Sequence, residues 1–256
     1  MNMQQKQFLK FIKLLSDNDL LKHVIVVGSW AEFVYKESGL LKDFNPNIKT
    51  LDLDFLIKNL RKPNPPKNLM GLAEDEGYIV EQDYMTEITK IFDKKGLEIE
   101  FLLGKRGAGH ELAFKTNIGV VAQTLWHMNI LLNNAVTVKC FDIEIDVPKP
   151  EAYVIHKIVI NNQRGNKKEK DRQAIINLIS YIDKMEFTRI FFQLTKRESR
   201  SVIKFLYNND ISSFGVFEPN QKTLDAMKET EEIIKHPERY KSYENINEVL
   251  KEINND

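Results

Sequence analysis

Two aspartates lie one residue apart in an otherwise apolar run over residues 49 to 57. Side chains alternate between the two faces of a β-strand, so Asp52 and Asp54 share one face while Leu53 and Phe55 share the other. Burying two anions side by side without a partner is costly, and a divalent cation between them removes that cost. The pattern therefore favours a metal site, although an edge strand with its polar face in water has the same alternation.

A second acidic pair follows in the run 97 to 103, where Glu98 and Glu100 share one face of a predicted strand. If this strand lies beside the first, up to four carboxylates converge. Residues 43 to 103 carry eight Lys and Arg against twelve Asp and Glu, a net charge of −4 that suits a cation site. The sequence does not decide whether Glu98 or Glu100 faces the metal.

A sharp turn at Gly28 joins a β-branched run, residues 23 to 27, to a predicted helix that reaches about residue 41. Glycine permits such a turn, and we expect Ser29 to cap the helix. The first backbone N–H groups of that helix would then point outward, as in many phosphate sites. A Gly-Ser pair is also an ordinary way for a helix to begin.

Basic residues concentrate in residues 156 to 172, which have a net charge of +4. The cations are Lys157, Arg164, Lys167, Lys168, Lys170 and Arg172, and the anions are Glu169 and Asp171. Such a run is usually a solvated corner between helices, and a phosphate-binding patch is the functional alternative. Lys105 and Arg106, in the glycine-rich loop 104 to 109, could also contact phosphates, although a surface loop is the simpler interpretation.

The predicted elements give an α+β fold, with strands and helices in the first part followed by a helical domain. An antiparallel meander is expected at 78–80, 86–92 and 97–103, further strands at 136–147, and helices at 5–22, 118–133, 151–163, 167–184, 186–208, 221–235 and 243–254. Pro148 and Pro150 mark the boundary between the two parts. We therefore predict domains at residues 1–147 and 148–256.

The composition indicates a folded protein without a strong global charge. Its 256 residues are 42% hydrophobic and 29% charged, and 37 Lys and Arg balance 37 Asp and Glu. The single cysteine and five scattered histidines give little support to a zinc site, so oxygen ligands are expected. No apolar run is long enough to cross a bilayer, and the N-terminus is polar, so we expect a cytoplasmic protein with no membrane partner.

Five ordered segments carry a resemblance to a known family. They begin at Val27-Gly28-Ser29, Thr50-Leu51-Asp52-Leu53-Asp54, Leu97-Glu98-Ile99-Glu100, Pro148-Lys149-Pro150-Glu151 and Lys170-Asp171-Arg172. Their order resembles the nucleotidyltransferase superfold related to DNA polymerase beta, and this resemblance implies a mixed β-sheet with flanking helices in the first domain. More narrowly it is similar to bacterial GSU-type or NTP transferase 8 nucleotidyltransferases, and to the AbiEii-like (MNT-type) toxins of toxin–antitoxin and phage-defence systems.

The resemblance implies a Mg²⁺-dependent enzyme that moves a nucleoside monophosphate from an NTP, such as ATP, to an acceptor hydroxyl and releases pyrophosphate. Asp52, Asp54 and Glu100 would be the metal ligands, for one ion or for two about 4 Å apart. A glutamate stands at the third position where aspartate is common, and its extra methylene alters its reach.

The resemblance also implies a set of phosphate contacts. Gly28 and Ser29 would approach the β- and γ-phosphates, and Lys157 would act as a catalytic cation with Arg164 and Lys170 as nucleotide-binding companions. Asp171 would orient one of these lysines.

The sequence does not decide among three acceptors, which are a tRNA end, a protein side chain and a small molecule. An antitoxin is a candidate partner. The alternative function is a non-catalytic regulator that binds nucleotide, RNA or protein on the same fold. Four remaining residues are expected to pack or to be satisfied polar groups: Trp30, Trp126, His127 and His156.

Overall fold

The computed structural model describes residues 2–46, 51–60, 66–105, 111–161, 165, 168–211 and 221–239. The chain falls into two compact units, residues 1–211 and residues 212–256. Within the described residues, the first unit holds the strands and the helices up to Asn208, and the second holds α9 (Gln221–Lys235) and η3 (Pro237–Arg239). The predicted domain boundary at residues 147/148 stays a prediction.

The first unit begins with the elements that build its sheets. They are α1 (Met3–Asp17), η1 (Leu21–His23), β1 (Val24–Val27), α2 (Ser29–Glu37), β2 (Asp52–Ile57), α3 (Leu69–Asp75), β3 (Ile79–Gln82), β4 (Thr89–Phe92), β5 (Glu98–Gly104), β6 (Ala113–Lys115), β7 (Val121–Leu125), α4 (Asn129–Leu132), β8 (Ala135–Cys140) and β9 (Ile143–Pro148). Four helices follow: α5 (Pro150–Asn161), α6 (Lys168–Ile179), α7 (Lys184–Phe191) and α8 (Lys196–Asn208).

The larger sheet is mixed, as the sequence predicts. Its strands run in the order β1-β2-β5-β4-β3, and β7 joins the end of β5 and carries β6. β1 is antiparallel to β2, β2 is parallel to β5, and β3, β4 and β5 form the predicted antiparallel meander. β8 and β9 form a separate hairpin, and β9 packs beside β1.

The two faces of the central strands differ in chemistry because their side chains alternate. On one face, Phe55 and Phe101 stack with their ring centroids 5.9 Å apart, and Phe11 of α1 packs on Phe55. On the other face, Leu56 and Leu102 are covered by α4. The carboxylates of β2 and β5 precede these two leucines, so they lie beyond the part of the face that α4 covers.

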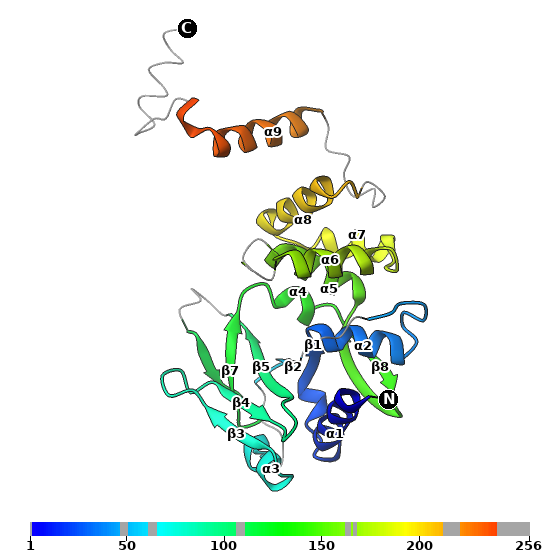
Figure 1. Cartoon of the computed structure of the whole chain (residues 1–256), viewed down its shortest axis with the longest axis vertical. Coiled ribbons are helices and arrows are strands. Elements are labelled where there is room, and N and C mark those ends of the chain that lie inside the picture. Colours follow the sequence, from blue (N-terminus) through cyan, green and yellow to red (C-terminus); the bar gives the residue numbers. More distant parts are fainter. Residues whose placement is uncertain are drawn as a thin grey trace. The chain divides into compact units, whose positions relative to one another are not determined.

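Within the first unit, the four helices α5 to α8 lie together on one side of the larger sheet (Figure 1). α5 contacts α6, α7 and α8, and α4 packs against α5. The predicted helices at 151–163, 167–184 and 221–235 are confirmed with small changes at their ends. The described helices include none long and apolar enough to cross a membrane.

The prediction of a helix over residues 118 to 133 is largely wrong. Residues Val121–Leu125 form β7, and only Asn129–Leu132 are helical. Gly119, with φ of 89°, turns the chain into an extended conformation, and β7 then pairs with both β5 and β6. Tertiary hydrogen bonding therefore overrides an apolar spacing that fits a helix equally well.

The predicted helix over residues 186 to 208 is two helices, because a capping box starts a new one. Thr195 accepts a hydrogen bond from the backbone N–H of Glu198, and the Glu198 carboxylate accepts one from the backbone N–H of Thr195. α7 thus ends at Phe191, before α8 begins. The helix predicted at 243–254 lies outside the described residues.

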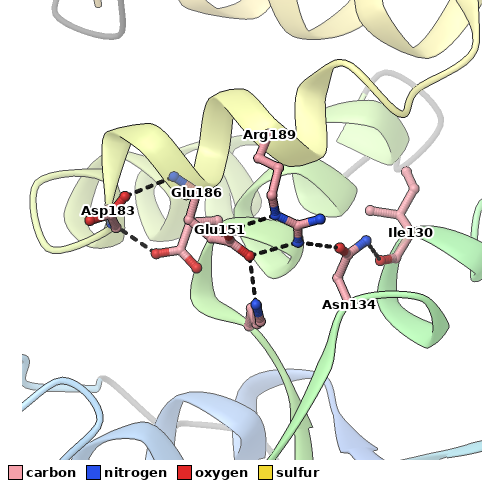
Figure 2. A network of polar contacts seen from close by, with 7 residues as sticks. Ile130, Asn134, Glu151, Asp183, Glu186 and Arg189 are labelled. Carbon is pink, nitrogen blue, oxygen red and sulfur yellow. Dashed lines mark hydrogen bonds and ion pairs between the residues drawn. The ribbon is translucent and has the colours of Figure 1, made fainter.

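A polar network fastens α7 to the junction between the sheets and α5 (Figure 2). The Arg189 guanidinium donates to Glu186 at 2.7 Å and to the Asn134 side chain at 3.2 Å, and the Lys149 ammonium lies 2.7 Å from Glu186. Glu151 accepts a hydrogen bond from the backbone N–H of Asp183 at 2.8 Å. These contacts therefore fix the position of α7 relative to the start of α5.

This network predicts a pH-dependent contribution to stability. Hydrogen bonds from Arg189 and Lys149 lower the pKa of Glu186 from 4.5 to about 2. The carboxylate therefore stabilises the fold above about pH 4.5, and this contribution is lost as the pH falls towards 2. We expect Glu186→Gln to lower the free energy of unfolding by about 1 kcal/mol at pH 7. Urea titrations should show the difference shrinking between pH 4.5 and 2, and a difference independent of pH would contradict this origin.

Candidate active site

The strand register brings the predicted carboxylates together in pairs. Asp52 lies beside Glu98 and Asp54 beside Glu100 on the parallel strands β2 and β5, and all four are half-buried. In this register they share the face of the sheet that also carries Leu56 and Leu102. The antiparallel pairing of β1 with β2 places Val27 opposite Asp54, which brings the Gly28 turn to the same place.

Gly28 is required by two features of this turn. Its φ of 65° and ψ of −159° belong to a region of backbone conformation that is essentially reserved for glycine. In addition, a Cβ atom at position 28 would overlap the carboxylate of Asp54. The turn therefore allows the backbone to approach one of the predicted metal ligands directly.

The expectation that Ser29 caps α2 is wrong. Gly28 is the N-cap residue and makes no side-chain cap hydrogen bond, because it has no side chain, and Ser29 is the first helical residue. Ser29 still lies directly after the Gly28 turn, as the sequence predicts. The backbone N–H groups of the first turn of a helix have no partners inside the helix, so this end of α2 keeps the chemistry that binds phosphate.

A buried carboxylate ties α2 to the helical part of the unit. Glu32, in the first turn of α2, accepts a hydrogen bond from the Tyr153 hydroxyl of α5 at 2.7 Å. Burial raises the pKa of Glu32, and the Tyr153 hydrogen bond and the nearby Lys157 charge act in the opposite direction. Glu32 and Gly28 are four residues apart, about one helical turn. The Gly28 turn is therefore close to α5.

Lys157 and Asp171 form a largely buried ion pair between α5 and α6. The Lys157 ammonium lies 3.1 Å from the Asp171 carboxylate and 5.1 Å from the centre of the Tyr153 ring. This contact gives Asp171 a position from which it can orient Lys157. Lys170 is exposed on α6, and its charge is near enough to act on Glu32. Arg164 lies outside the described residues.

Lys90 of β4 is a cation that the sequence patterns did not single out. Its ammonium is ion-paired with both Glu98 and Glu100, the latter at 2.8 Å, and these contacts raise the pKa of Lys90 above its usual value. Lys90 lies directly opposite Glu100 in the β4–β5 register. Eight or more residues separate Lys90 from both glutamates in the sequence. Its contact with them could therefore be recognised only once the pairing of β4 with β5 was known.

The donor set suits Mg²⁺ through its two aspartates. Mg²⁺ is commonly held by one or two carboxylates together with substrate phosphates, and Asp52 and Asp54 share one face of β2. In the part of the chain that the structure describes, no three His, Cys, Asp or Glu side chains are grouped as a metal site. Glu100, the third predicted ligand, is ion-paired with Lys90.

Sequence reasoning also missed Glu32 and Tyr153. Each looks like an ordinary helix residue, and their hydrogen bond joins segments 121 positions apart in the chain. Trp30 is buried as predicted and stacks on Phe8, with ring centroids 4.8 Å apart. Trp126, which was expected to pack or to be a satisfied polar group, is 49% exposed, and the Lys105 ammonium lies 5.3 Å from the centre of its ring.

Comparison with known proteins identifies the class that this site belongs to. A family model described as Nucleotidyltransferase matches residues 6–196, and the chain therefore belongs to the nucleotidyltransferase family. The comparison with curated proteins finds no match.

Two solved structures are similar to the chain. A crystal structure of an antigenic nucleotidyltransferase-like protein from Paracoccidioides brasiliensis has 14% sequence identity and a TM-score of 0.45, and the match covers 78% of this chain and 88% of that one. A solution structure of the antibiotic-resistance factor ANT(2'')-Ia has 10% identity and a TM-score of 0.39, with 93% and 99% covered.

Proposed function

We propose that the protein is a Mg²⁺-dependent enzyme that transfers a nucleoside monophosphate from an NTP to an acceptor hydroxyl and releases pyrophosphate. The observation that carries the proposal is the contact of Asp54 with the Gly28 turn, because a carboxylate is a suitable Mg²⁺ ligand and the start of a helix is a suitable place for a phosphate. The family match supports transfer of a nucleotide as the general activity.

In this proposal the acidic residues bind the metal, and the helix start and the basic residues bind the phosphates. Asp52 and Asp54 would hold Mg²⁺, which when bound neutralises phosphate charge and makes the acceptor hydroxyl a better nucleophile. The start of α2, with Gly28 and Ser29, would receive the β- and γ-phosphates. Lys157, held by Asp171, would neutralise a phosphate from the helical side. Catalysis of this kind depends mainly on positioning and charge neutralisation.

The direct test is label transfer. Purified protein is incubated with Mg²⁺, each α-labelled NTP in turn, and total RNA, protein extract or small-molecule hydroxyl acceptors such as aminoglycosides. We expect label in one acceptor class for the unmutated chain and none for Asp54→Asn. Asp75→Asn, at an exposed carboxylate on α3, is the matched control and should transfer normally. Undiminished transfer by a folded Asp54→Asn protein would refute the proposal.

One observation favours the non-catalytic alternative, a regulator that binds nucleotide. Glu98 and Glu100 are both ion-paired with Lys90, and this pairing competes with metal binding by either carboxylate. A regulator should bind NTP, measured by equilibrium dialysis, without transferring label to any acceptor. The enzyme should do both.

The same contact leads to a prediction for metal affinity. We expect Lys90→Gln to bind Mg²⁺ several-fold more tightly, because the variant frees Glu100 to join Asp52 and Asp54. The measurement is the Mg²⁺ concentration that gives half of the thermal stabilisation by the ion, with Lys94→Gln, at a nearby lysine outside this cluster, as control. Equal Mg²⁺ affinity in both variants would show that Lys90 does not compete with the metal.

A role as a toxin with an antitoxin partner makes a separate prediction. Expression of the chain alone should then arrest bacterial growth, while expression of Asp54→Asn should not. A housekeeping or resistance enzyme should leave growth unchanged in both cases. Co-expression of a neutralising protein would identify the antitoxin.

A further inference from the structure

A cavity of about 530 Å³ lies where β5 and β7 end, beside α4 and the start of α8. Its lining includes Lys105, Trp126, His127, Arg197 and Glu198. The volume is within the range of small-molecule sites in proteins, about 300–1,000 Å³. The cavity is separate from the carboxylates, because Glu100 lies four residues before Gly104 on β5, about 13 Å along the strand.

The turn that presents Trp126 is held in place by α8. His127, the next residue, has a left-handed φ of 66°, a conformation that costs a non-glycine residue about 1–3 kcal/mol. Its ring Nδ1 lies 2.6 Å from the Glu198 carboxylate. This contact fixes the strained turn, and the indole next to it stays 49% exposed instead of packing inward. The half-exposed indole therefore forms part of the lining of the cavity.

The charges around the indole favour an anion. Glu198 is already engaged by His127, by the Thr195 backbone N–H at 2.9 Å and by the Thr195 hydroxyl at 2.7 Å. Burial works to raise the pKa of Glu198, but these hydrogen bonds hold it below its usual value. The other charged residues of the lining, Lys105 and Arg197, are both cations, and the Lys105 ammonium lies 5.3 Å from the centre of the Trp126 ring.

We propose that this cavity binds one 5′-phosphorylated nucleotide residue, with the base stacked on Trp126 and the phosphate between Lys105 and Arg197. Base stacking on an aromatic side chain contributes about 1–3 kcal/mol and tolerates any base, and Arg pairs well with phosphate. The nucleotide residue has two sources with the same chemistry, a free nucleoside monophosphate or the 5′ end of an RNA strand. The binding does not depend on nucleotidyl transfer, so it stands or falls separately from the proposed function.

Tryptophan fluorescence offers a direct measurement of nucleotide binding beside Trp126, because the chain has only two tryptophans and the other, Trp30, is buried. The full-length protein is titrated without Mg²⁺ with AMP, with adenosine and with a 5′-phosphorylated tetra-adenylate. We expect saturable quenching by AMP or the tetra-adenylate, and at least tenfold weaker binding of adenosine. The tighter of the two phosphorylated probes identifies the source of the nucleotide.

Variants test whether the fluorescence change comes from Trp126 and whether Arg197 contacts the phosphate. Trp126→Phe should leave only Trp30 emission, with no response to AMP. Arg197→Gln should weaken binding about tenfold, whereas Arg200→Gln, at an exposed arginine one turn further along α8, should bind normally. Asp54→Asn should also bind normally, which separates this cavity from the carboxylate site.

Four results would overturn the proposal. The first three are the absence of quenching by both phosphorylated probes at millimolar concentration, a response that persists in Trp126→Phe, and equal affinity of the Arg197→Gln and Arg200→Gln variants. A loss of binding in Asp54→Asn would likewise overturn it, by assigning the nucleotide to the carboxylate site.

Discussion

Nucleotidyl transfer is expected to fall by at least about 100-fold when Gly28 is replaced by alanine. The added Cβ atom overlaps the Asp54 carboxylate, so either the strand or the turn must move. A displacement of about 1 Å at a catalytic group is sufficient to reduce rates by about 100-fold. The alanine also has to adopt the glycine-only conformation of residue 28, which should lower the free energy of unfolding by about 1–3 kcal/mol.

Gly39→Ala is the matched control for this prediction. Gly39 has a φ of 77°, so alanine is strained there too, but the nearest atom to its added Cβ would be the Lys42 Cε at 3.6 Å, an ordinary contact. We expect Gly39→Ala to lower the stability and to keep normal kcat/KM. Both quantities are measured on both variants, by urea unfolding and by label transfer. Equal kcat/KM values for Gly28→Ala and Gly39→Ala would show that the Gly28 turn is not part of the active site.

The sequence was sufficient to predict the parts of the site that depend on local pattern. The alternation around Asp52 and Asp54 predicts a strand with one acidic face, and β2 has this form. Glu98 and Glu100 repeat the pattern on β5, and the meander that leads into β5 has clear turn residues. The change to helices after Pro148 follows from the same short-range signals, whereas the mixed sheet was implied by the family resemblance.

The contacts that decide the chemistry depend on which strands become neighbours. Lys90 meets Glu98 and Glu100 only because β4 pairs with β5 in one particular register, and a shift of one residue would turn its side chain to the other face. The cavity beside Trp126 depends on β7, which the apolar spacing had suggested to be helical. Long-range pairing therefore limits sequence-based prediction of this site more than local propensity does.

The largest effect on stability is expected from breaking the ion pair between Lys157 and Asp171. The Asp171 carboxylate is 4% exposed, and Glu32 lies close enough to add a second negative charge to its surroundings. Removal of one partner from a buried pair typically costs about 3–5 kcal/mol, because the remaining buried charge loses the opposite charge of that partner. We expect Lys157→Met to lower the free energy of unfolding by about 3 kcal/mol, measured by urea titration at pH 7.

The double variant Lys157→Met, Asp171→Leu separates this structural role from catalysis. Apolar residues of similar volume often replace a buried ion pair at no cost, so its stability should return to within about 1 kcal/mol of the unmutated protein. If Lys157 contacts a phosphate, transfer stays at least about 100-fold reduced in the double variant, because no cation has been restored. Recovery of both stability and transfer would limit Lys157 to holding α5 against α6. Recovery of stability alone would place its ammonium in the catalytic machinery, with Asp171 as the residue that positions it.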